Sequence, residues 1–330
     1  MNIPTTMRAL QQMSLNGPQD MRLVEDAAVP SPSPDEVLVR IVAAGVNFAD
    51  ISKSRGTFRD GPTPPYLAGF EAAGEVVAVG AAVAGELLGT RVVGVGEGTF
   101  AEYAVFPAAG VVPVPSGWTG VEALGLLVNV VTALAVLKPV GALVATQTVL
   151  IHAAAGATGQ AAVTVAKHYG ATVIATASPG KHEVVRALGA DHVLDSVDGD
   201  IVAEVLRLTG GVGADLVLES AGGVTFEASL AAAKRVTGRV VVYGLAGGEA
   251  SVTNWELVYK HQVHLAGFNL GMLIQATPQV FGSLMGELSS LIAAGILTPG
   301  RPTTYELTDG PKALAELEDR ATTGKLALLP

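Results

Sequence analysis

The chain has 330 residues and a formal net charge of −10, with 49% hydrophobic and 15% charged residues. This length favours two domains over one, and the apolar content is enough for a large core. An acidic chain without a run of lysines and arginines is a poor partner for nucleic acid, because phosphate backbones repel it. Cysteine is absent, which excludes disulfides, thiolate zinc sites and a cysteine nucleophile.

The first 120 residues are predicted to be β-rich, with short strand-like runs such as 36–47 (EVLVRIVAAGVN) separated by glycine and proline. The N-terminal segment lacks the long apolar stretch of a signal peptide. The apolar stretches 123–137 and 139–166 are interpreted as core helices and buried strands. The first is too short to span a membrane, and the second is broken by Pro139 and glycines. We therefore expect no membrane segment and a soluble, cytoplasmic protein.

Strands and helices alternate from about residue 121. The pattern predicts helices at 121–137, 157–169, 180–188, 200–208 and 225–235, and strands at 147–152, 171–176, 191–194, 214–219 and 238–243. This alternation is typical of βαβ units on a parallel sheet. Beyond residue 250 the pattern predicts a strand near 262–267, helices at about 277–294 and 310–320, and a terminal strand in KLALLP. The predicted fold class is α/β, with a nucleotide-binding domain inserted between two parts of a more β-rich domain.

A glycine-containing turn joins the strand at 147–152 to the next helix. It reads AAGATG from Ala154 to Gly159, the pattern A-x-G-x-x-G. Gly156 would let the main chain approach a pyrophosphate, and Gly159 would let the helix pack closely on the sheet. The free N–H groups and positive end of the helix would hold the phosphates. Because Ala154 replaces the usual first glycine, an ordinary strand–turn–helix is the alternative, but the βαβ context favours a dinucleotide site.

The loop after the second strand of this unit favours NADPH over NADH. An NADH site usually carries Asp or Glu at this place, to accept a hydrogen bond from the ribose 2′-hydroxyl. Here the chain reads ATVIATASPGKH, and its first acidic residue is Glu183. Ser178 and Lys181 can instead hold a 2′-phosphate, which a carboxylate would repel. The alternative is that Lys181 is simply an exposed lysine at a helix start.

With these residues considered together, the chain resembles the zinc-independent quinone oxidoreductases of the medium-chain dehydrogenase/reductase superfamily. The resemblance runs from about residue 7 to 330 and is carried by 45–50 (GVNFAD), 68–74 (AGFEAAG), 129–133 (NVVTA), 152–159 (HAAAGATG) and 318–325 (EDRATTGK). It implies a Rossmann parallel-sheet domain inserted in a GroES-like catalytic domain, with NADPH in the cleft between them, a small-molecule substrate and a homodimer. The expected boundaries are 1–124 and 266–330 for the catalytic domain and 125–265 for the NADPH-binding domain.

The same resemblance implies roles for individual residues. Asn47 and Thr132 would line the nicotinamide end and act in catalysis. The other implied cofactor-binding residues are Gly156, Ala157 and Thr158 at the pyrophosphate, Ser178, Lys181, Ser196 and Arg320 at the adenosine phosphate, Ser220, Tyr243, Gly244 and Leu245 along the groove, and Phe268 and Asn269 at the nicotinamide side.

The chain departs from its relatives at several positions. The zinc enzymes of the superfamily carry a cysteine and a histidine where this chain has Asn47 and Phe70, which cannot supply a thiolate or an imidazole, so no metal is expected. Ser52 stands where the family often has a tyrosine, which leaves the proton donor open. Ser196 likewise replaces a tyrosine that often touches the 2′-phosphate.

Four residues near these motifs also have structural interpretations. Asn47 follows a strand and could form a turn. Asp50 could be the N-cap of the helix that follows it. Thr132 lies in an apolar helical run, where its hydroxyl could bond back to a carbonyl one turn earlier. His152 precedes the glycine turn and is interpreted as a core histidine rather than a base.

These features predict an NADPH-dependent, zinc-free oxidoreductase that transfers hydride to a quinone or an α,β-unsaturated carbonyl. The developing enolate oxygen would be stabilised by hydrogen bonds from Asn47, Thr132 and backbone amides. The alternatives are an enoyl-thioester reductase, a non-redox cyclase or isomerase, and a non-catalytic NADPH-binding protein. No G-x-S-x-G sequence occurs, which removes an α/β-hydrolase. The natural substrate and the oligomeric state stay open.

Overall fold

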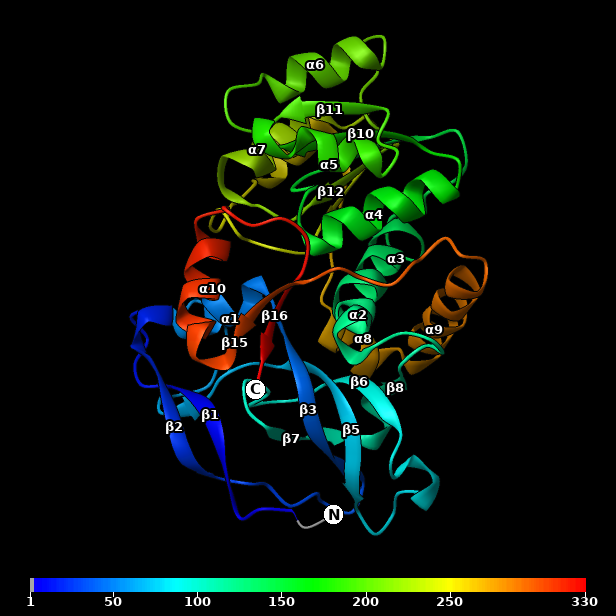
Figure 1. The fold of residues 1–330 in the computed structure, drawn as a ribbon. Coiled ribbons are helices and arrows are strands. Elements are labelled where there is room, and N and C mark those ends of the chain that lie inside the picture. The colour runs from blue at the N-terminus through cyan, green and yellow to red at the C-terminus, as the bar shows by residue number, and fades with distance from the viewer. Residues whose placement is uncertain (1–2) are drawn as a thin grey trace. The chain divides into compact units, whose positions relative to one another are not determined.

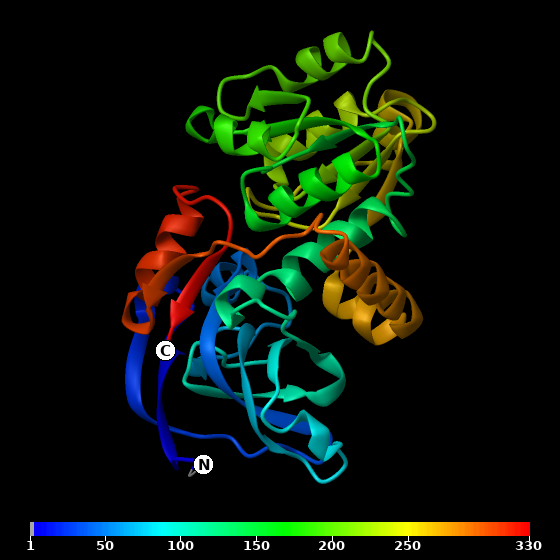
Figure 2. The same cartoon turned by 45° about the vertical axis from the view of Figure 1, so that its right-hand side comes forward.

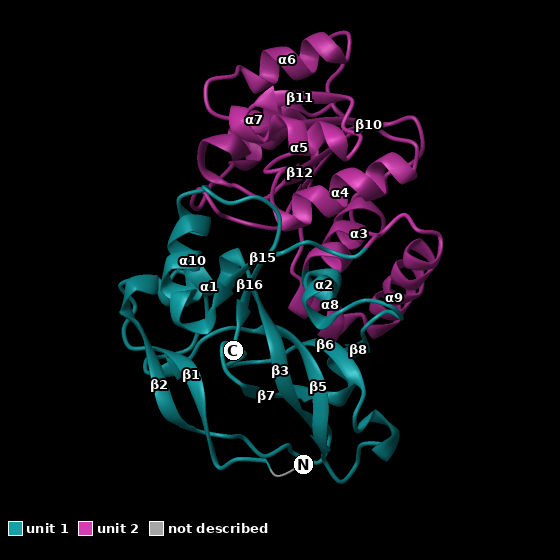
Figure 3. Cartoon of the chain, in the orientation of Figure 1, with its two compact units in different colours: residues 1–128, 299–330 teal, residues 129–298 magenta. Residues whose placement is uncertain are grey.

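The computed structural model describes residues 3–330 and divides into two compact units, coloured separately in Figure 3. Unit 1 comprises residues 1–128 and 299–330, and unit 2 comprises residues 129–298. The first boundary lies close to the predicted 124/125. The second lies at 298/299 rather than at the predicted 265/266.

Unit 1 is β-rich, as the short strand-like runs predicted (Figure 1). A three-stranded sheet has the order β2–β1–β4. A larger sheet has the order β15–β16–β3–β5–β6–β8, and β7 also pairs with β3. The strands are β1 (Thr6–Gln12), β2 (Met21–Ala28), β3 (Glu36–Val46), β4 (Tyr66–Leu67), β5 (Glu71–Val79), β6 (Arg91–Val95), β7 (Tyr103–Pro107), β8 (Val111–Pro113), β15 (Thr303–Glu306) and β16 (Leu326–Leu329).

Strand β3 is the centre of the larger sheet, since it pairs antiparallel with β5, β7 and β16. Val37, Val39 and Ile41 are buried and join the main core of the unit. The strand ends at Val46, so the next residues begin a helix at the edge of that core. The helices of unit 1 are α1 (Phe48–Ser54), α2 (Gly120–Ala123) and α10 (Gly310–Glu318), and α10 packs against α1.

Unit 2 is built on a parallel sheet with the order β11–β10–β9–β12–β13–β14. The strands are β9 (Thr148–Ile151), β10 (Thr172–Ala177), β11 (His192–Asp195), β12 (Leu216–Glu219), β13 (Arg239–Val242) and β14 (His264–Gly267). The connecting helices are α4 (Ala157–His168), α5 (His182–Ala187), α6 (Ile201–Leu208) and α7 (Gly223–Ala232).

The order of these strands reverses at β9. Because β-α-β crossovers are right-handed, the reversal places α4 and α5 on one face of the sheet and α6 and α7 on the other. The contacts between α6 and α7 agree with this arrangement. Figure 2 shows the chain from a second direction. Open parallel sheets bind ligands beside the carboxyl ends of their strands at such a reversal.

Helices α8 (Leu270–Ala276) and α9 (Pro278–Ala293) explain why unit 2 extends beyond residue 265. Leu284, Leu288 and Leu291 of α9 are buried, and α9 packs against α3 (Val131–Leu137). The Tyr169 hydroxyl at the end of α4 bonds to Glu287 of α9. The sequence pattern showed a helix here but not with which unit it packs.

The helix predicted at 121–137 is wrong in its middle. The chain forms α2, then a π-helical turn at Leu126–Val130, and then α3. Gly125 interrupts the run because it has a φ of 88° and because its N–H donates to the Glu71 carboxylate at 2.8 Å. Among residues 3–330, Gly120–Leu137 is the one stretch long and apolar enough to cross a membrane, and it is 78% buried inside the protein.

Candidate functional site

The turn between β9 and α4 contains two glycines, of which only one is required for packing. A Cβ on Gly159 would lie 2.4 Å from the Ala153 carbonyl oxygen and 2.6 Å from the Ala154 Cα, so only glycine allows this approach. The packing role predicted for Gly159 is confirmed. A Cβ on Gly156 would meet only the Ala153 oxygen, at 3.4 Å, so folding alone does not require glycine there. A residue without a side chain at this position leaves the main chain accessible to a ligand.

The first turn of α4 presents unused hydrogen-bond donors. The first bond within the helix runs from Gln160 N to Gly156 O, at 2.8 Å. The amides of Ala157, Thr158 and Gly159 come before it and have no acceptor within the helix. These amides lie at the positive end of a helix of 12 residues. The turn therefore fits the diphosphate of a dinucleotide by its main chain.

The loops after β10 and β11 lie side by side. Ser178 follows β10 directly, and Ser196 follows β11 and donates from its N–H to the Ala177 carbonyl at 3.0 Å. Lys181 ends the short helical turn that begins at Pro179. Within the described chain, β10 is followed by no acid before Glu183, whose carboxylate bonds to Arg186 at 2.6 Å. Arg320, predicted at the same phosphate, belongs to unit 1.

The predicted groove residues at the ends of β12 and β13 come together. Ser220 and Tyr243 are hydrogen-bonded through their side chains, and burial raises the pKa of Tyr243 to about 12. Gly244 must be glycine, since a Cβ there would lie 2.5 Å from the Ser220 carbonyl oxygen. Gly244 and Leu245 line a cavity of 290 Å³ together with Gly222. The cavity lies at the carboxyl edge of the parallel sheet.

The residues predicted at the nicotinamide side differ in whether their hydrogen-bonding groups are already used within the protein. Phe268 follows β14 and donates from its N–H to the Val242 carbonyl at 2.8 Å. Asn269 is the N-cap of α8, and its Oδ1 accepts from Met272 N at 2.9 Å. Thr132 is half-buried on α3, and within residues 3–330 its hydroxyl makes no hydrogen bond. The back-bond to a carbonyl one turn earlier is thus not formed, and the hydroxyl remains available.

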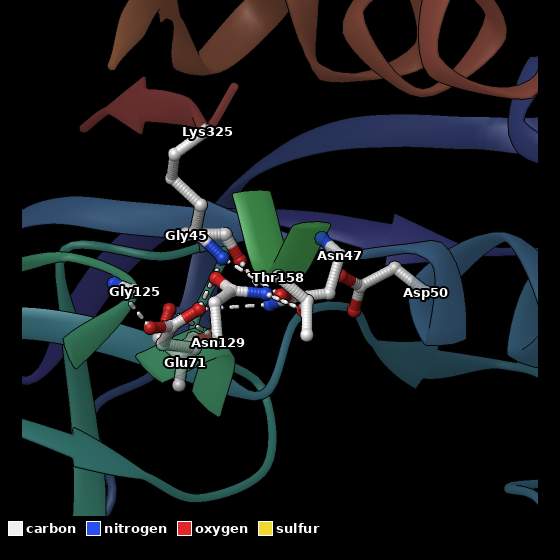
Figure 4. A network of polar contacts seen from close by, with 9 residues as sticks. Gly45, Asn47, Asp50, Glu71, Gly125, Asn129, Thr158 and Lys325 are labelled. Carbon is white, nitrogen blue, oxygen red and sulfur yellow. Dashed lines mark hydrogen bonds and ion pairs between the residues drawn. The ribbon is translucent and has the colours of Figure 1, made fainter. Parts of the chain in front are cut away.

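Asn47 lies in a buried charged network in unit 1 (Figure 4). Its Nδ2 donates to Glu71 at 2.9 Å and to the Gly45 carbonyl at 3.2 Å, and its Oδ1 accepts from Lys325 Nζ at 2.7 Å. Lys325 also pairs with Glu71 directly. The second Glu71 oxygen accepts from Gly125 N.

This network limits what Asn47 can do. A side-chain amide has two N–H donors, and both are used here. In this arrangement Asn47 therefore has no N–H for a developing oxyanion. The hydrogen-bond capacity therefore favours Thr132 over Asn47 as a donor.

Asp50 serves helix α1 in a different position from the one expected. Asn47, not Asp50, is the N-cap of α1, and Asp50 lies three residues into the turn, where its Oδ2 accepts from Asn47 N at 2.9 Å. Its Oδ1 is buried without a partner. Burial raises the pKa of Asp50 to about 7, although Lys53 and Lys325 oppose this rise.

The residues of unit 1 do not fit a catalytic zinc. The two positions that would supply thiolate and imidazole are Asn47 and Phe70. The Lys325 ammonium lies 2.7 Å from the Asn47 oxygen, where its charge opposes that of a divalent cation. Within residues 3–330, no group of three or more His, Asp or Glu side chains lies together as a metal site.

A second buried polar network stabilises the strand ends of unit 2. His152 contacts Thr176 at 3.1 Å through Nδ1 and Ser229 at 3.0 Å through Nε2. The Ser229 hydroxyl also donates to Glu219, whose other oxygen accepts from Gly222 N at 2.8 Å. Burial lowers the pKa of His152. The histidine is thus a hydrogen-bonded core residue, as interpreted from the sequence.

Sequence reasoning missed three residues of these clusters. Glu71 and Lys325 lie in stretches that carry the family resemblance, and a charged residue within an apolar strand run was the available signal for each. Asn129 also lies in such a stretch. Its Nδ2 donates to the Thr158 hydroxyl at 2.9 Å, a pairing that spacing along the chain could not show.

Two family models match the chain in the regions just described. The alcohol dehydrogenase GroES-like domain matches residues 33–116, in unit 1. The zinc-binding dehydrogenase model matches residues 157–287, in unit 2. The predicted combination of a GroES-like domain with a Rossmann parallel-sheet domain is confirmed.

Solved structures match the whole chain. A mycobacterial protein in complex with NADPH is 33% identical, with a TM-score of 0.91, over 98% of this chain and all of its own. The quinone oxidoreductase of Pseudomonas syringae pv. Tomato DC3000 is 32% identical, with the same score and coverage. The CurK enoyl reductase is 28% identical, with a TM-score of 0.88, over 98% and 99%. The chain belongs to the quinone oxidoreductase family of the medium-chain dehydrogenase/reductase superfamily.

Proposed function

We propose that this protein is an NADPH-dependent, zinc-free reductase that transfers hydride to a quinone or an α,β-unsaturated carbonyl. The observation that carries the proposal is the turn at Gly156, where a Cβ would meet a single protein atom, at 3.4 Å, and where the amides of Ala157, Thr158 and Gly159 have no acceptor within α4. The loop after β10 adds Ser178 and Lys181 without a carboxylate, which favours a 2′-phosphate. The NADPH complex of the mycobacterial relative supports the same cofactor.

Different residues of the chain would bind the cofactor and stabilise the charge that develops in such a reaction. Bound NADPH supplies hydride to an electron-poor carbon of the acceptor. The amides of Ala157 and Thr158 and the loop at Lys181 bind the phosphates and fix the position of the dinucleotide. Thr132 donates its free hydroxyl to the oxygen on which negative charge develops. Asn47, held by Glu71 and Lys325, keeps its place at the start of α1 beside the proposed site. The proton that completes the reduction comes from solvent.

The proposal is tested by binding and turnover together. Fluorescence titration is expected to show NADPH binding more tightly than NADH. Oxidation of NADPH is expected with 1,4-benzoquinone or with 2-cyclohexenone. Binding of NADPH without oxidation by any quinone, enone or enoyl thioester would instead indicate a cofactor-binding protein without redox activity or a cyclase or isomerase.

An enoyl-thioester reductase is the second candidate, and one finding favours it. The CurK enoyl reductase matches nearly the full length of this chain. An enoyl thioester is also an α,β-unsaturated carbonyl, so the same residues would serve. Comparing kcat/KM for crotonyl-CoA with that for 1,4-benzoquinone separates the two, since the natural acceptor class should be preferred by more than tenfold.

We also propose that the protein is a soluble, cytoplasmic homodimer. β14 is the edge strand of its sheet, and Leu265 and Gly267 direct their N–H and C=O groups away from β13. The side chains of Leu265, Trp255 and Tyr259 are exposed nearby along the chain. Pairing of the β14 strands of two subunits would cover both the unpaired backbone groups and these exposed side chains. Sedimentation velocity tests this: the wild type should sediment as a dimer and Leu265→Asp as a monomer, whereas a monomeric wild type rejects it.

A further inference from the structure

Asn129 has an unusual hydrogen-bonding state for a buried amide. It lies in the π-helical turn before α3 and is only 8% exposed. Its Nδ2 donates to the Thr158 hydroxyl, but its Oδ1 is buried without a partner (Figure 4). A buried amide oxygen without a donor costs free energy, so such an atom in a native protein calls for an explanation.

The bond to Thr158 determines what the threonine hydroxyl can do. A hydroxyl has one proton and two lone pairs. Because Oγ1 accepts from Asn129 at 2.9 Å, one lone pair is used and the proton is directed elsewhere. No acceptor within residues 3–330 takes this proton. Thr158 is the second residue of α4, so its free O–H lies beside the unused amides of the same turn.

We propose that Asn129 is a positioning residue for the dinucleotide. Its Nδ2 holds the Thr158 hydroxyl so that the O–H donates to a phosphate oxygen of the ligand, and its Oδ1 accepts from a ribose hydroxyl or the carboxamide N–H of the same ligand. This inference rests on the proposed function, because it requires a dinucleotide at the turn. Asn129 lies outside the glycine motif, and it determines the direction in which the Thr158 hydroxyl of the motif donates.

The chemistry of the ligand matches both atoms of the amide. A phosphate oxygen accepts hydrogen bonds only, so it needs a hydroxyl whose proton is free. Ribose hydroxyls and a carboxamide supply the donors that Oδ1 lacks. An aspartate at position 129 would reverse the direction of the hydrogen bond to Thr158. A carboxylate cannot donate, so it would accept the hydroxyl proton that the phosphate needs.

The test measures the Kd of NADPH by fluorescence titration, which needs no turnover. Asn129→Leu keeps the size of the side chain and should raise the Kd about tenfold, because both bonds are lost. Asn129→Asp should raise it further, because it also brings a negative charge toward the phosphates. Asn16→Leu is the matched control, since the same substitution at an exposed asparagine of unit 1, whose Nδ2 bonds to Asp20, should leave the Kd unchanged. Unchanged melting temperatures for the free variants show that the fold is intact.

A double-mutant cycle separates the two bonds. In a Thr158→Val background the bond between the side chains is already absent, so Asn129→Leu should raise the Kd by only about threefold, through the loss of the Oδ1 contact. Equal effects in both backgrounds would overturn the positioning of Thr158, and no effect in either would overturn the whole inference. If the wild type itself binds neither NADPH nor NADH, it is the proposed function that fails.

Discussion

The Asn47 cluster of unit 1 and the first turn of α4 in unit 2 differ in how their hydrogen-bonding groups are used. In unit 1, Asn47, Glu71 and Lys325 satisfy one another, and the amide of Asn47 keeps no free N–H. In unit 2, the first turn of α4 and the hydroxyl of Thr132 keep donors that no protein group uses. Polar side chains that bond to one another stabilise the fold, whereas donors that have no protein acceptor remain available to bind a ligand. Stability should therefore respond most to changes in unit 1, and cofactor affinity to changes in unit 2.

The largest expected effect is the loss of stability on breaking the Glu71–Lys325 ion pair of unit 1. Lys325→Met removes the only cation bonded to Glu71 among the described residues and leaves a fully buried carboxylate. We expect a loss of about 3–5 kcal/mol in the free energy of unfolding, measured by urea denaturation. The double variant Glu71→Gln/Lys325→Met removes both charges and should recover more than half of this loss. A double variant no more stable than Lys325→Met would show that packing, not charge, is the cause.

Asp50 makes the stability of unit 1 depend on pH. Its pKa is about 7 when folded, against a usual value of 3.8, so between pH 4 and 7 the folded protein keeps a proton that the unfolded chain releases. The free energy of unfolding therefore falls as pH rises through this range. At about 1.4 kcal/mol per pH unit, the fall is at most about 4 kcal/mol.

Asp50→Asn tests this dependence, because the amide oxygen can still accept from Asn47 N but does not titrate. Relative to wild type, the variant should gain stability between pH 4 and 7 and keep that gain at pH 8. Urea denaturation at pH 4.5 and pH 8 is sufficient. Ser52→Ala, two residues further along the same helix, is the control whose difference from wild type should not change with pH. An Asp50→Asn difference that is the same at both pH values would contradict the raised pKa.

The two glycines of the turn in unit 2 should respond differently to alanine. Gly159→Ala brings its Cβ to 2.4 Å from a backbone oxygen, so the helix must move, and we expect about 1–3 kcal/mol of lost stability together with weaker NADPH binding. Gly156→Ala meets nothing closer than 3.4 Å at an ordinary φ of −78°, so it should fold normally and lose only NADPH affinity. Thermal melting and fluorescence titration of both variants would check this contrast, and wild-type affinity in Gly156→Ala would refute it.

The sequence predicted the elements of unit 2 well because local patterns determine them. The strand ends at Ile151, Ala177 and Val242 lie within one residue of the predicted ends, since β-branched runs bounded by small residues and turns fix such positions. The break at Gly125 was not predicted. It depends on a hydrogen bond to Glu71, far away in the chain, which no local pattern shows.

In the candidate site, too, the features set by local sequence were predictable and those set by distant contacts were not. The turn at Gly156 has a sequence signature, because a close backbone approach demands small residues in a fixed spacing. The environment of Asn47 does not, since its partners Glu71 and Lys325 are 24 and 278 residues away. Asn129 was missed for the same reason. Its relation to Thr158 arises from the packing of α3 against α4.

The smallest expected effect is at the loop after β10. Lys181→Gln removes a partly exposed positive charge that the proposed function places at the 2′-phosphate. Because water and salt screen such a contact, we expect only about a fivefold rise in the Kd of NADPH and none in that of NADH, which lacks the phosphate. Lys167→Gln is the matched control, since Lys167 pairs with Asp191 at 2.7 Å on the same unit. If Lys181→Gln weakens NADH as much as NADPH, the lysine supports the loop rather than the phosphate, and the preference must come from Ser178 and Ser196.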